Sequence, residues 1–275
     1  MRLFCGHISA FREVTQILIR HRDLIWEMAR RDISDRYAGQ AFGLLWAVGH
    51  PLFMMALFVF IFAFVFKTKV GGTIQMPLDY TTYILAGLIP WMAFQESMNK
   101  SCSAITTNAS LVKQVVFPLE LLPAKGVLAS LLPQLVSTFV LLGYVLLVHG
   151  GFSLIYLLLP VLIMLQLLAM IGLAYMFAAI GAYFRDIKDF VQMFGMAGVY
   201  LAPIVYLPEM VPTLFKPVLY LNPFSYVIWC YQDVIYFGRI EHPYAWIVFP
   251  MLSITIFVVG YRLFRKLKIG FGNVL

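Results

Sequence analysis

Long apolar runs separated by short polar segments dominate the chain beyond its first forty residues. A helix needs about 20 predominantly apolar residues to cross the hydrocarbon core of a bilayer. Six runs meet or approach this length, so the pattern predicts an all-α integral membrane protein with six transmembrane helices. We place these helices at residues 42–66, 80–104, 126–148, 154–183, 190–206 and 244–263.

The N-terminal segment, residues 1–41, has a different pattern. Apolar side chains recur there at spacings of three, four and seven residues, at Phe11, Val14, Leu18, Ile25 and Met28. This periodicity is typical of an amphipathic helix, or of two short ones. Because seven arginines precede the first predicted span, we expect an interfacial helix on the anionic cytoplasmic surface of the membrane. A solvated helix packed on a partner is compatible with the same pattern.

Residues 203–240 interrupt the run of predicted spans. Five prolines occur between Pro203 and Pro223, yet the segment stays apolar and aromatic. Proline removes a backbone donor and breaks helices, so a full span is not expected here. We predict a re-entrant hairpin of two short helices between helices five and six; an ordinary interfacial loop with aromatic residues is the alternative.

Composition and charge fix the class and the orientation. Hydrophobic residues make up 62% of the 275 residues and charged residues 12%, with a mean hydropathy of +0.87, which excludes an ordinary soluble domain. In the six-helix layout, 16 of the 20 lysines and arginines fall on one side of the membrane. Since cytoplasmic loops are enriched in these residues, both termini are predicted to be cytoplasmic and the hairpin to lie on the outer face. The same assignment explains the net charge of +7 without nucleic acid, which we do not expect the chain to bind. We divide the chain into residues 1–41, a membrane domain over 42–264 and a cytoplasmic tail over 265–275.

Several catalytic classes lack their sequence signature. No phosphate-binding GxxxxGK[ST] loop occurs, so the chain is not expected to hydrolyse ATP itself. The three cysteines lie far apart and predict neither a metal site nor a disulfide framework. No histidine is followed by aspartate five residues later, as a common membrane acyltransferase pattern requires. The sequence also lacks the ring of like-charged residues that would indicate an ion channel.

Charged residues near the predicted membrane surface are expected to pair with one another. Asp32 with Asp35, and Asp186 with Asp189, form DxxD pairs that in principle hold Mg²⁺ on a prenyl pyrophosphate. Neighbouring basic residues make ion pairing the simpler explanation. Glu96 and Lys100, one turn apart at the inner end of the second predicted helix, are likewise predicted to form an ion pair.

Three stretches of the sequence form a recognisable set. They are the order FRDIKD, APIVY and LNPFSY within residues 181–238, RRDISDRYAGQAFGLLWAVGHPL at 30–52 and NASLVKQVVFPLELLP at 108–123. Together they resemble the permease subunit of ABC-2 type exporters, and within that family the branch that exports lipid-linked O-antigen, capsule or teichoic acid chains. The resemblance implies a bacterial inner membrane protein that pairs with a second copy of itself and two copies of an ATPase subunit, among membrane lipids. It also implies that the partner subunits bind ATP and Mg²⁺ and that this chain holds no cofactor.

Three sets of candidate site residues follow. A surface that docks the ATPase is expected at Asn108, Leu111, Lys113, Gln114, Phe117, Arg185, Asp186, Arg30 and Arg31. Aromatic rings can stack on sugar faces, so a channel lining is predicted at Trp46, Phe53, Phe60, Phe190 and Phe194. An outer gate is predicted at Pro203, Tyr206, Pro208, Pro212, Asn222 and Pro223.

Two other functions stay open from the sequence. An exporter of drugs or small lipids within the same family would share the six-helix pattern. A membrane enzyme of lipid-linked glycan assembly, acting on a prenyl phosphate, would need no partner ATPase.

Overall fold

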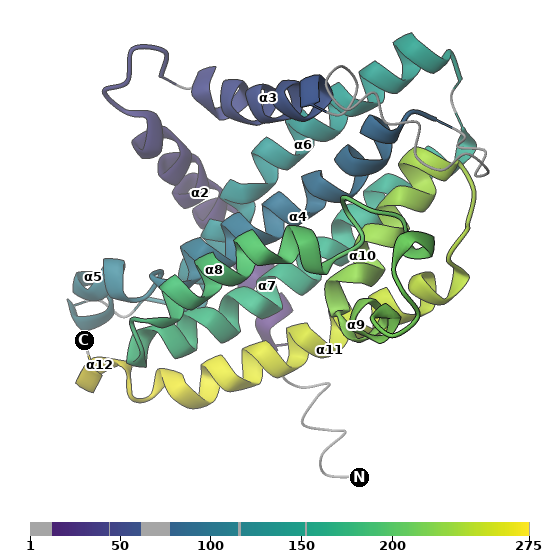
Figure 1. Cartoon of the computed structure of the whole chain (residues 1–275). Helices are drawn as coiled ribbons and strands as arrows, with labels where there is room; N and C mark the ends of the chain where they lie inside the picture. The colour runs from purple at the N-terminus through teal and green to yellow at the C-terminus, as the bar shows by residue number, and fades with distance from the viewer. Residues whose placement is uncertain (1–12, 44, 62–77, 115–116, 152, 275) are drawn as a thin grey trace.

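The computed structural model describes residues 13–43, 45–61, 78–114, 117–151 and 153–274. All regular structure in these residues is helical, which confirms the predicted all-α class. Figure 1 shows that the longer helices run along a common direction, while two N-terminal helices lie across one side of them.

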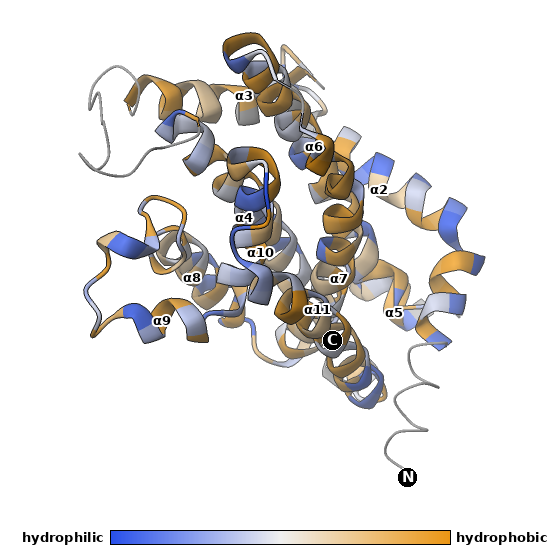
Figure 2. Cartoon of the chain, turned by 90° about the vertical axis from the view of Figure 1, so that its right-hand side faces the viewer, coloured by the Kyte–Doolittle hydropathy of each residue, from blue (hydrophilic) through white to orange (hydrophobic). Residues whose placement is uncertain are grey.

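The longest helices are α6 (Leu121–His149), α7 (Leu159–Tyr183) and α11 (Pro243–Lys268). A short 3-10 turn, η3 (Leu154–Leu158), leads into α7. Within the described residues, α6, the η3–α7 unit and α11 are long and apolar enough to cross a membrane. Figure 2 shows these helices as predominantly hydrophobic. The chain is therefore a membrane-embedded protein that crosses the bilayer more than once.

Helix α4 (Tyr80–Cys102) lies in the middle of the bundle, and most of its side chains are buried. It packs against α6 and α7, against α8 (Ile187–Leu201) and against α10 (Pro223–Gln232). Trp91 of α4 is buried between Phe194 and Phe224, and its Nε1 donates to the Gly195 carbonyl at 3.2 Å. These contacts make α4 the element that joins α8 and α10 to the long helices.

Helices α7 and α11 approach each other closely at two glycines. A Cβ added to Gly260 would lie 2.0 Å from the carbonyl oxygen of Gly172. A Cβ added to Gly181 of α7 would lie 2.0 Å from the carbonyl oxygen of Cys102 in α4. Small residues at such crossings let membrane helices pack through their backbones, because lipid supplies little hydrophobic driving force between helices.

A buried polar cluster joins α6, α7 and α10. Gln134 donates from Nε2 to Gln166 Oε1 at 2.6 Å, and the Tyr231 hydroxyl donates to the same oxygen at 2.5 Å. Gln166 in turn donates from Nε2 to the carbonyl oxygen of Pro90 in α4 at 3.2 Å. Such hydrogen bonds hold membrane helices together because the alternative is an unpaired polar group in hydrocarbon.

The N-terminal region forms a helix over residues 13–20 and a second, α2 (Arg22–Tyr37), followed by α3 (Leu45–Val59). Val14, Ile25 and Ala29 are buried against the bundle, whereas Trp26 is 65% exposed. Two helices thus cover the described part of the segment for which an amphipathic helix, or two short ones, was predicted. Phe11, the first residue of that pattern, lies outside the described residues.

Short helices fill the remaining connections. Helix α4 is followed by η2 (Thr106–Asn108) and α5 (Ala109–Gln114), and α11 is followed by α12 (Phe271–Val274). Between α8 and α11 the chain forms η4 (Pro208–Met210), α9 (Lys216–Leu221), α10 and the π-helical turn η5 (Asp233–Phe237). Helix α10 and η5 are almost entirely buried, so the second half of the predicted hairpin belongs to the core.

Several predicted helices differ from those observed. The third was predicted to begin at residue 126, but α6 begins at Leu121, and the sixth was predicted to end at residue 263, but α11 continues to Lys268. The prediction of a fifth helix over 190–206 was wrong at both ends, because α8 begins at Ile187 and ends at Leu201. Ala202 is extended, as expected for a residue that precedes proline. Helix α3 covers 45–59 of the first predicted span, and residues 62–66 lie outside the described part of the chain. At 15 residues each, α3 and α8 are about 22 Å long, shorter than the hydrocarbon core of about 30 Å.

Candidate functional site

The predicted docking surface has its centre on η2 and α5, at one end of the bundle. Lys113 is exposed, while Leu111 and Phe117 are half-buried. Phe117 packs on a buried apolar cluster that includes Leu119 and Leu122. Asn108 donates from Nδ2 to the Ala104 carbonyl at 2.8 Å and so holds the turn that leaves α4. Gln114 is the last residue of α5. This segment therefore presents a basic side chain on a short helix fixed to the core.

The other predicted docking residues lie on two further elements. Arg185 and Asp186 are exposed in the turn between α7 and α8, which lies at the same end of the bundle as α5 in Figure 1. Asp186 is the residue immediately before α8, and its carbonyl accepts from the Phe190 amide at 3.2 Å. Arg30 and Arg31 are exposed on α2, where Arg31 pairs with Asp35 at 3.5 Å.

Ion pairs between distant parts of the chain stabilise this end of the bundle. Lys125 of α6 contacts Asp32 of α2 at 2.9 Å, and Lys268 of α11 contacts Glu120 at 2.8 Å. Arg265 of α11 contacts Glu13 in the first helix at 2.5 Å. Asp32 thus forms an ion pair, although with the distant Lys125 and not with a neighbouring basic residue as predicted, and the predicted Glu96–Lys100 pair is confirmed at 3.0 Å. Sequence reasoning missed the two pairs made by α11, because their members lie 148 and 252 residues apart.

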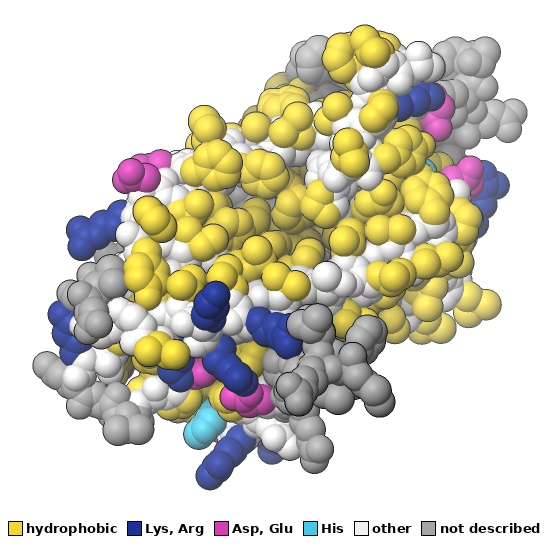
Figure 3. Space-filling view, turned by 90° about the horizontal axis from the view of Figure 1, so that it is seen from below, with side chains coloured by type: hydrophobic (Ala, Val, Ile, Leu, Met, Phe, Trp, Pro, Cys, Tyr) yellow, Lys and Arg dark blue, Asp and Glu magenta, His cyan; other side chains and the backbone are white. Residues whose placement is uncertain are grey.

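The predicted aromatic lining divides into exposed and packed members. Trp46, Phe53 and Phe60 of the α3 region and Phe190 of α8 are between 41% and 66% exposed. Phe194 is half-buried and packs on Trp91 and Phe224. Helices α3 and α8 lie on different sides of α4 and α6 in Figure 2, so a single chain does not bring these two sets of rings together. Apolar side chains also cover much of the face seen in Figure 3, where lysines and arginines gather toward one edge.

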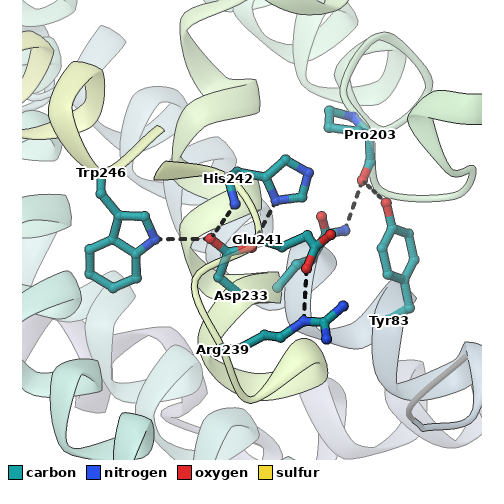
Figure 4. A network of polar contacts seen from close by, with 8 residues as sticks. Tyr83, Pro203, Asp233, Arg239, Glu241, His242 and Trp246 are labelled. Atoms are coloured by element: carbon teal, nitrogen blue, oxygen red, sulfur yellow. Dashed lines mark hydrogen bonds and ion pairs between the residues drawn. The ribbon is translucent and has the colours of Figure 1, made fainter. Parts of the chain in front are cut away.

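The prolines and polar groups of the predicted gate shape the chain after α8. The Pro203 carbonyl accepts from Gln232 Nε2 at 2.8 Å and from the Tyr83 hydroxyl at 3.3 Å (Figure 4). Asn222 caps α10 by accepting from the Phe224 amide at 3.1 Å, and its Nδ2 donates to the Leu201 carbonyl at 3.2 Å.

Other gate residues serve as turn formers or stay accessible. Tyr206 donates to the Tyr200 carbonyl at 3.0 Å, Pro208 begins η4, and Pro223 is the first residue of α10. Pro212 is exposed on the loop that leads to α9. The hairpin is therefore tied to α4 and α10 at its base and accessible at its tip.

A buried carboxylate joins the end of this segment to α11. Asp233 is fully buried and accepts from His242 Nδ1 at 2.7 Å, from the His242 amide at 3.0 Å and from Trp246 Nε1 at 2.9 Å (Figure 4). Here the His242 ring nitrogen acts as the donor to the carboxylate. Sequence reasoning missed this cluster, because the only signal for it was an aspartate within an otherwise apolar run.

Another carboxylate, that of Asp79, caps the start of α4. Asp79 accepts from the Thr82 amide at 3.3 Å and the Thr82 hydroxyl at 2.6 Å, and it contacts His149 Nε2 at 2.9 Å. Burial opposes ionisation of Asp79, but the hydrogen bonds from Thr82 and His149 outweigh it and hold the pKa of this carboxyl below its usual value. The His149 contact links the start of α4 to the end of α6, where Gly150 closes the helix with φ at 65°.

Replacing Asp79 with asparagine is expected to remove an acid-sensitive part of the stability. A carboxyl with a depressed pKa stabilises the fold above its unfolded value of about 3.9, and this contribution disappears as pH falls through the folded pKa. We expect wild type to melt above Asp79→Asn by the equivalent of up to about 1 kcal/mol at neutral pH, because the ionised carboxyl lies at a helix N-terminus, and the gap to close in acid, as the pH falls below the unfolded pKa of about 3.9. Melting curves of the detergent-solubilised proteins across this range test it. An equal gap at neutral pH and in acid would contradict the role of the ionised carboxyl.

The described residues show no group of three or more histidine, cysteine, aspartate or glutamate side chains that would hold a metal. Cys102 and Cys230 are buried and unpaired with another cysteine. The polar side chains described above instead cap helices and join one helix to another.

Comparisons with known proteins give the same class. The family model described as ABC-2 type transporter matches residues 23–236. The chain is 28% identical over 254 residues to an O-antigen export system permease protein RfbA of Klebsiella pneumoniae, which covers 92% of this chain and 95% of the relative. It is 24% identical over 261 residues to the protein of that name from Myxococcus xanthus, covering 93% and 96%. It is also 22% identical over 238 residues to a polysialic acid transport protein KpsM of Escherichia coli, covering 86% and 90%. Because the family match covers well over half of the sequence, the chain belongs to the ABC-2 type transporter family.

Proposed function

We propose that the chain is the permease subunit of an ATP-driven exporter that moves a lipid-linked polysaccharide across the bacterial inner membrane. The observation that carries this proposal is the match over nearly the whole chain to proteins named for export of O-antigen and for transport of polysialic acid. The buried polar groups described above are consistent with a transport subunit, since they join the helices of the bundle to one another.

Energy for transport would come from a separate ATPase subunit that binds ATP and Mg²⁺. The docking surface would be the exposed residues of α5, with Lys113 at its centre, together with the turn at Arg185 and Asp186. Ion pairs at this end support that role, because they tie the first helix to α11, α2 to α6, and α11 to the start of α6. A push on α2 would thus reach the long helices directly.

The path for the polysaccharide would form between two copies of the chain. The exposed rings of the α3 region and of α8 lie on different sides of one chain, and a second copy would bring one set opposite the other. Aromatic faces suit this cargo because sugar rings present apolar faces to them. The hairpin from Pro203 to Phe224 would form the outer gate, with both termini on the cytoplasmic side and six helices, including the short α3 and α8, within the membrane.

Export in cells tests the proposal. Cells that lack the chain are expected to accumulate lipid-linked polysaccharide inside and to lose it from the surface, and wild-type protein should restore export. Lys113→Glu should reduce export by at least about tenfold, equivalent to about 1.4 kcal/mol, because it reverses a charge at the docking surface. Lys266→Glu, an equally exposed charge reversal at the same end, is the matched control and should export normally.

Surface staining and mass spectrometry of the lipid-linked glycans measure both variants at matched protein levels. If the glycans are exported normally without the chain, the cargo assignment is wrong. If both charge reversals export normally, α5 does not dock the ATPase.

A further inference from the structure

A small polar cavity of about 150 Å³ lies between α2 and the bundle, at the end that carries α5. Its walls come from the end of α4, from η2, from the first turn of α6 and from α2. Polar and charged side chains supply much of the lining, namely Asp32, Lys100, Ser103, Thr107, Asn108 and Lys125. This lining distinguishes it from the apolar clefts elsewhere on the molecule, such as the one between α6 and α7.

The two lysines retain donors that the protein does not use. Lys125 Nζ contacts Asp32 Oδ1 at 2.9 Å, and Lys100 Nζ contacts Glu96 Oε1 at 3.0 Å. An ammonium group carries three N–H donors, and among the described residues these contacts occupy one on each lysine. Both side chains are largely buried, 15% exposed for Lys125 and 25% for Lys100, so water satisfies the remaining donors incompletely.

Neighbouring hydroxyl groups add to this set. The Thr107 hydroxyl donates to the Ser103 carbonyl at 2.7 Å and accepts from Asn108 Nδ2 at 3.3 Å. The Ser103 hydroxyl has no partner among the residues that the structure describes. The cavity therefore offers two partly buried cations and a free hydroxyl to a group that carries several acceptor oxygens and no donors. Phosphate oxygens meet this description.

The carboxylate of Asp32 distinguishes between kinds of phosphate. A free phosphate dianion would meet the Asp32 charge and be repelled by it, whereas a phosphodiester carries a single negative charge. The amine or hydroxyl groups that follow the phosphodiester in phospholipid headgroups can also donate to Asp32. Because Glu96 likewise offsets the charge of Lys100, the two lysines and two carboxylates carry no net charge, and a headgroup that brings donors of its own fits them better than a free anion.

The setting of the cavity points to the membrane surface. Helix α2 forms one wall, and it exposes Trp26 and Leu24 beside its arginines. A basic helix with exposed apolar side chains is typical of the lipid headgroup layer. Basic pockets beside membrane helices are known to hold phospholipid headgroups.

We propose that this cavity binds the phosphodiester of a glycerophospholipid headgroup through Lys100 and Lys125. The bound lipid would add to the packing of α2 on α6, which already includes the Asp32–Lys125 ion pair. The proposal concerns a resident membrane lipid and is independent of the exported cargo.

Native mass spectrometry of the purified chain tests the proposal. Wild type, released from mild detergent, is expected to retain one phospholipid, and protein stripped of lipid should regain it from vesicles of phosphatidylglycerol and phosphatidylethanolamine. The double variant Lys100→Gln, Lys125→Gln should retain at least about tenfold less, since two charge-assisted hydrogen bonds of about 1.5 kcal/mol or more are lost. Lys100→Gln alone keeps the Asp32–Lys125 pair and should show an intermediate loss, even if the double variant folds poorly.

Lys113→Gln removes an equal charge outside the cavity and is the matched control, with wild-type lipid retention expected. Equal retention in the cavity variants and the control would overturn the proposal, as would absence of lipid from wild type. Inorganic phosphate, added to stripped protein, distinguishes the source of the ligand. If phosphate alone binds at the lysines and vesicles restore no lipid, the site is one for a soluble anion and the lipid assignment is wrong.

Discussion

Replacement of Gly260 by leucine is expected to separate α7 from α11 and to remove most of the folded protein from the membrane. A Cβ at Gly260 would lie 2.0 Å from the Gly172 carbonyl oxygen, and one at Gly172 would lie 2.6 Å from the backbone of Ile256. The obstacle is backbone on both sides, so no change of rotamer relieves it. Overpacking costs 1–3 kcal/mol and occasionally more, and here we expect more than about 3 kcal/mol.

The size-exclusion profile and melting temperature of the solubilised protein measure this effect. Gly260→Ala should already give much of the loss, because the first added carbon makes the clash. Gly143→Leu on α6 is the matched control, since a Cβ there meets nothing within 4 Å and leucine favours a helix by up to about 1 kcal/mol over glycine. Wild-type melting of Gly260→Leu would show that the two helices do not cross at this distance.

The positions of most helices could be predicted from hydropathy, because a membrane helix must satisfy its own backbone hydrogen bonds over a length set by the bilayer. Helices α4, η3–α7 and α11 begin within one residue of the predicted starts at 80, 154 and 244. The end of α8 was missed although the signal was present. Pro203 disfavours a helical conformation at Ala202, but the apolar residues after it resemble a continuing span.

The partners of buried polar groups could not be predicted in the same way. Gln134 and Gln166 are 32 residues apart, and Gln166 and Tyr231 are 65 apart. No local spacing links them, and only the packing of α6, α7 and α10 brings them together. Within the candidate site, too, local contacts could be predicted from the sequence and long-range contacts could not. The turn at Asn222 and Pro223 follows from local chemistry, whereas the ion pairs that tie α2 and α11 to α6 depend on the whole fold.

Replacement of Asp233 by alanine is expected to release the hairpin from α11. The substitution leaves the His242 ring nitrogen, the His242 amide and Trp246 Nε1 without their acceptor in a buried site. Each unsatisfied buried donor costs about 1–3 kcal/mol, so the total loss is expected to reach about 3 kcal/mol or more. Asp233→Asn keeps one carbonyl oxygen as an acceptor and should lose less.

Limited proteolysis and cysteine labelling between residues 203 and 242 would report the release. Glu241→Ala is the matched control, because its pair with Arg239 is largely exposed and such pairs contribute about 1 kcal/mol or less. We expect labelling of the hairpin to rise in Asp233→Ala, to rise less in Asp233→Asn and to stay at the wild-type level in Glu241→Ala. Export should fall in the same order if this segment acts as the proposed outer gate, because the gate would no longer be held to α11. Equal labelling in all three variants would mean that the Asp233 cluster does not hold the hairpin, and the gate would then depend on the contacts of Pro203 and Asn222 alone.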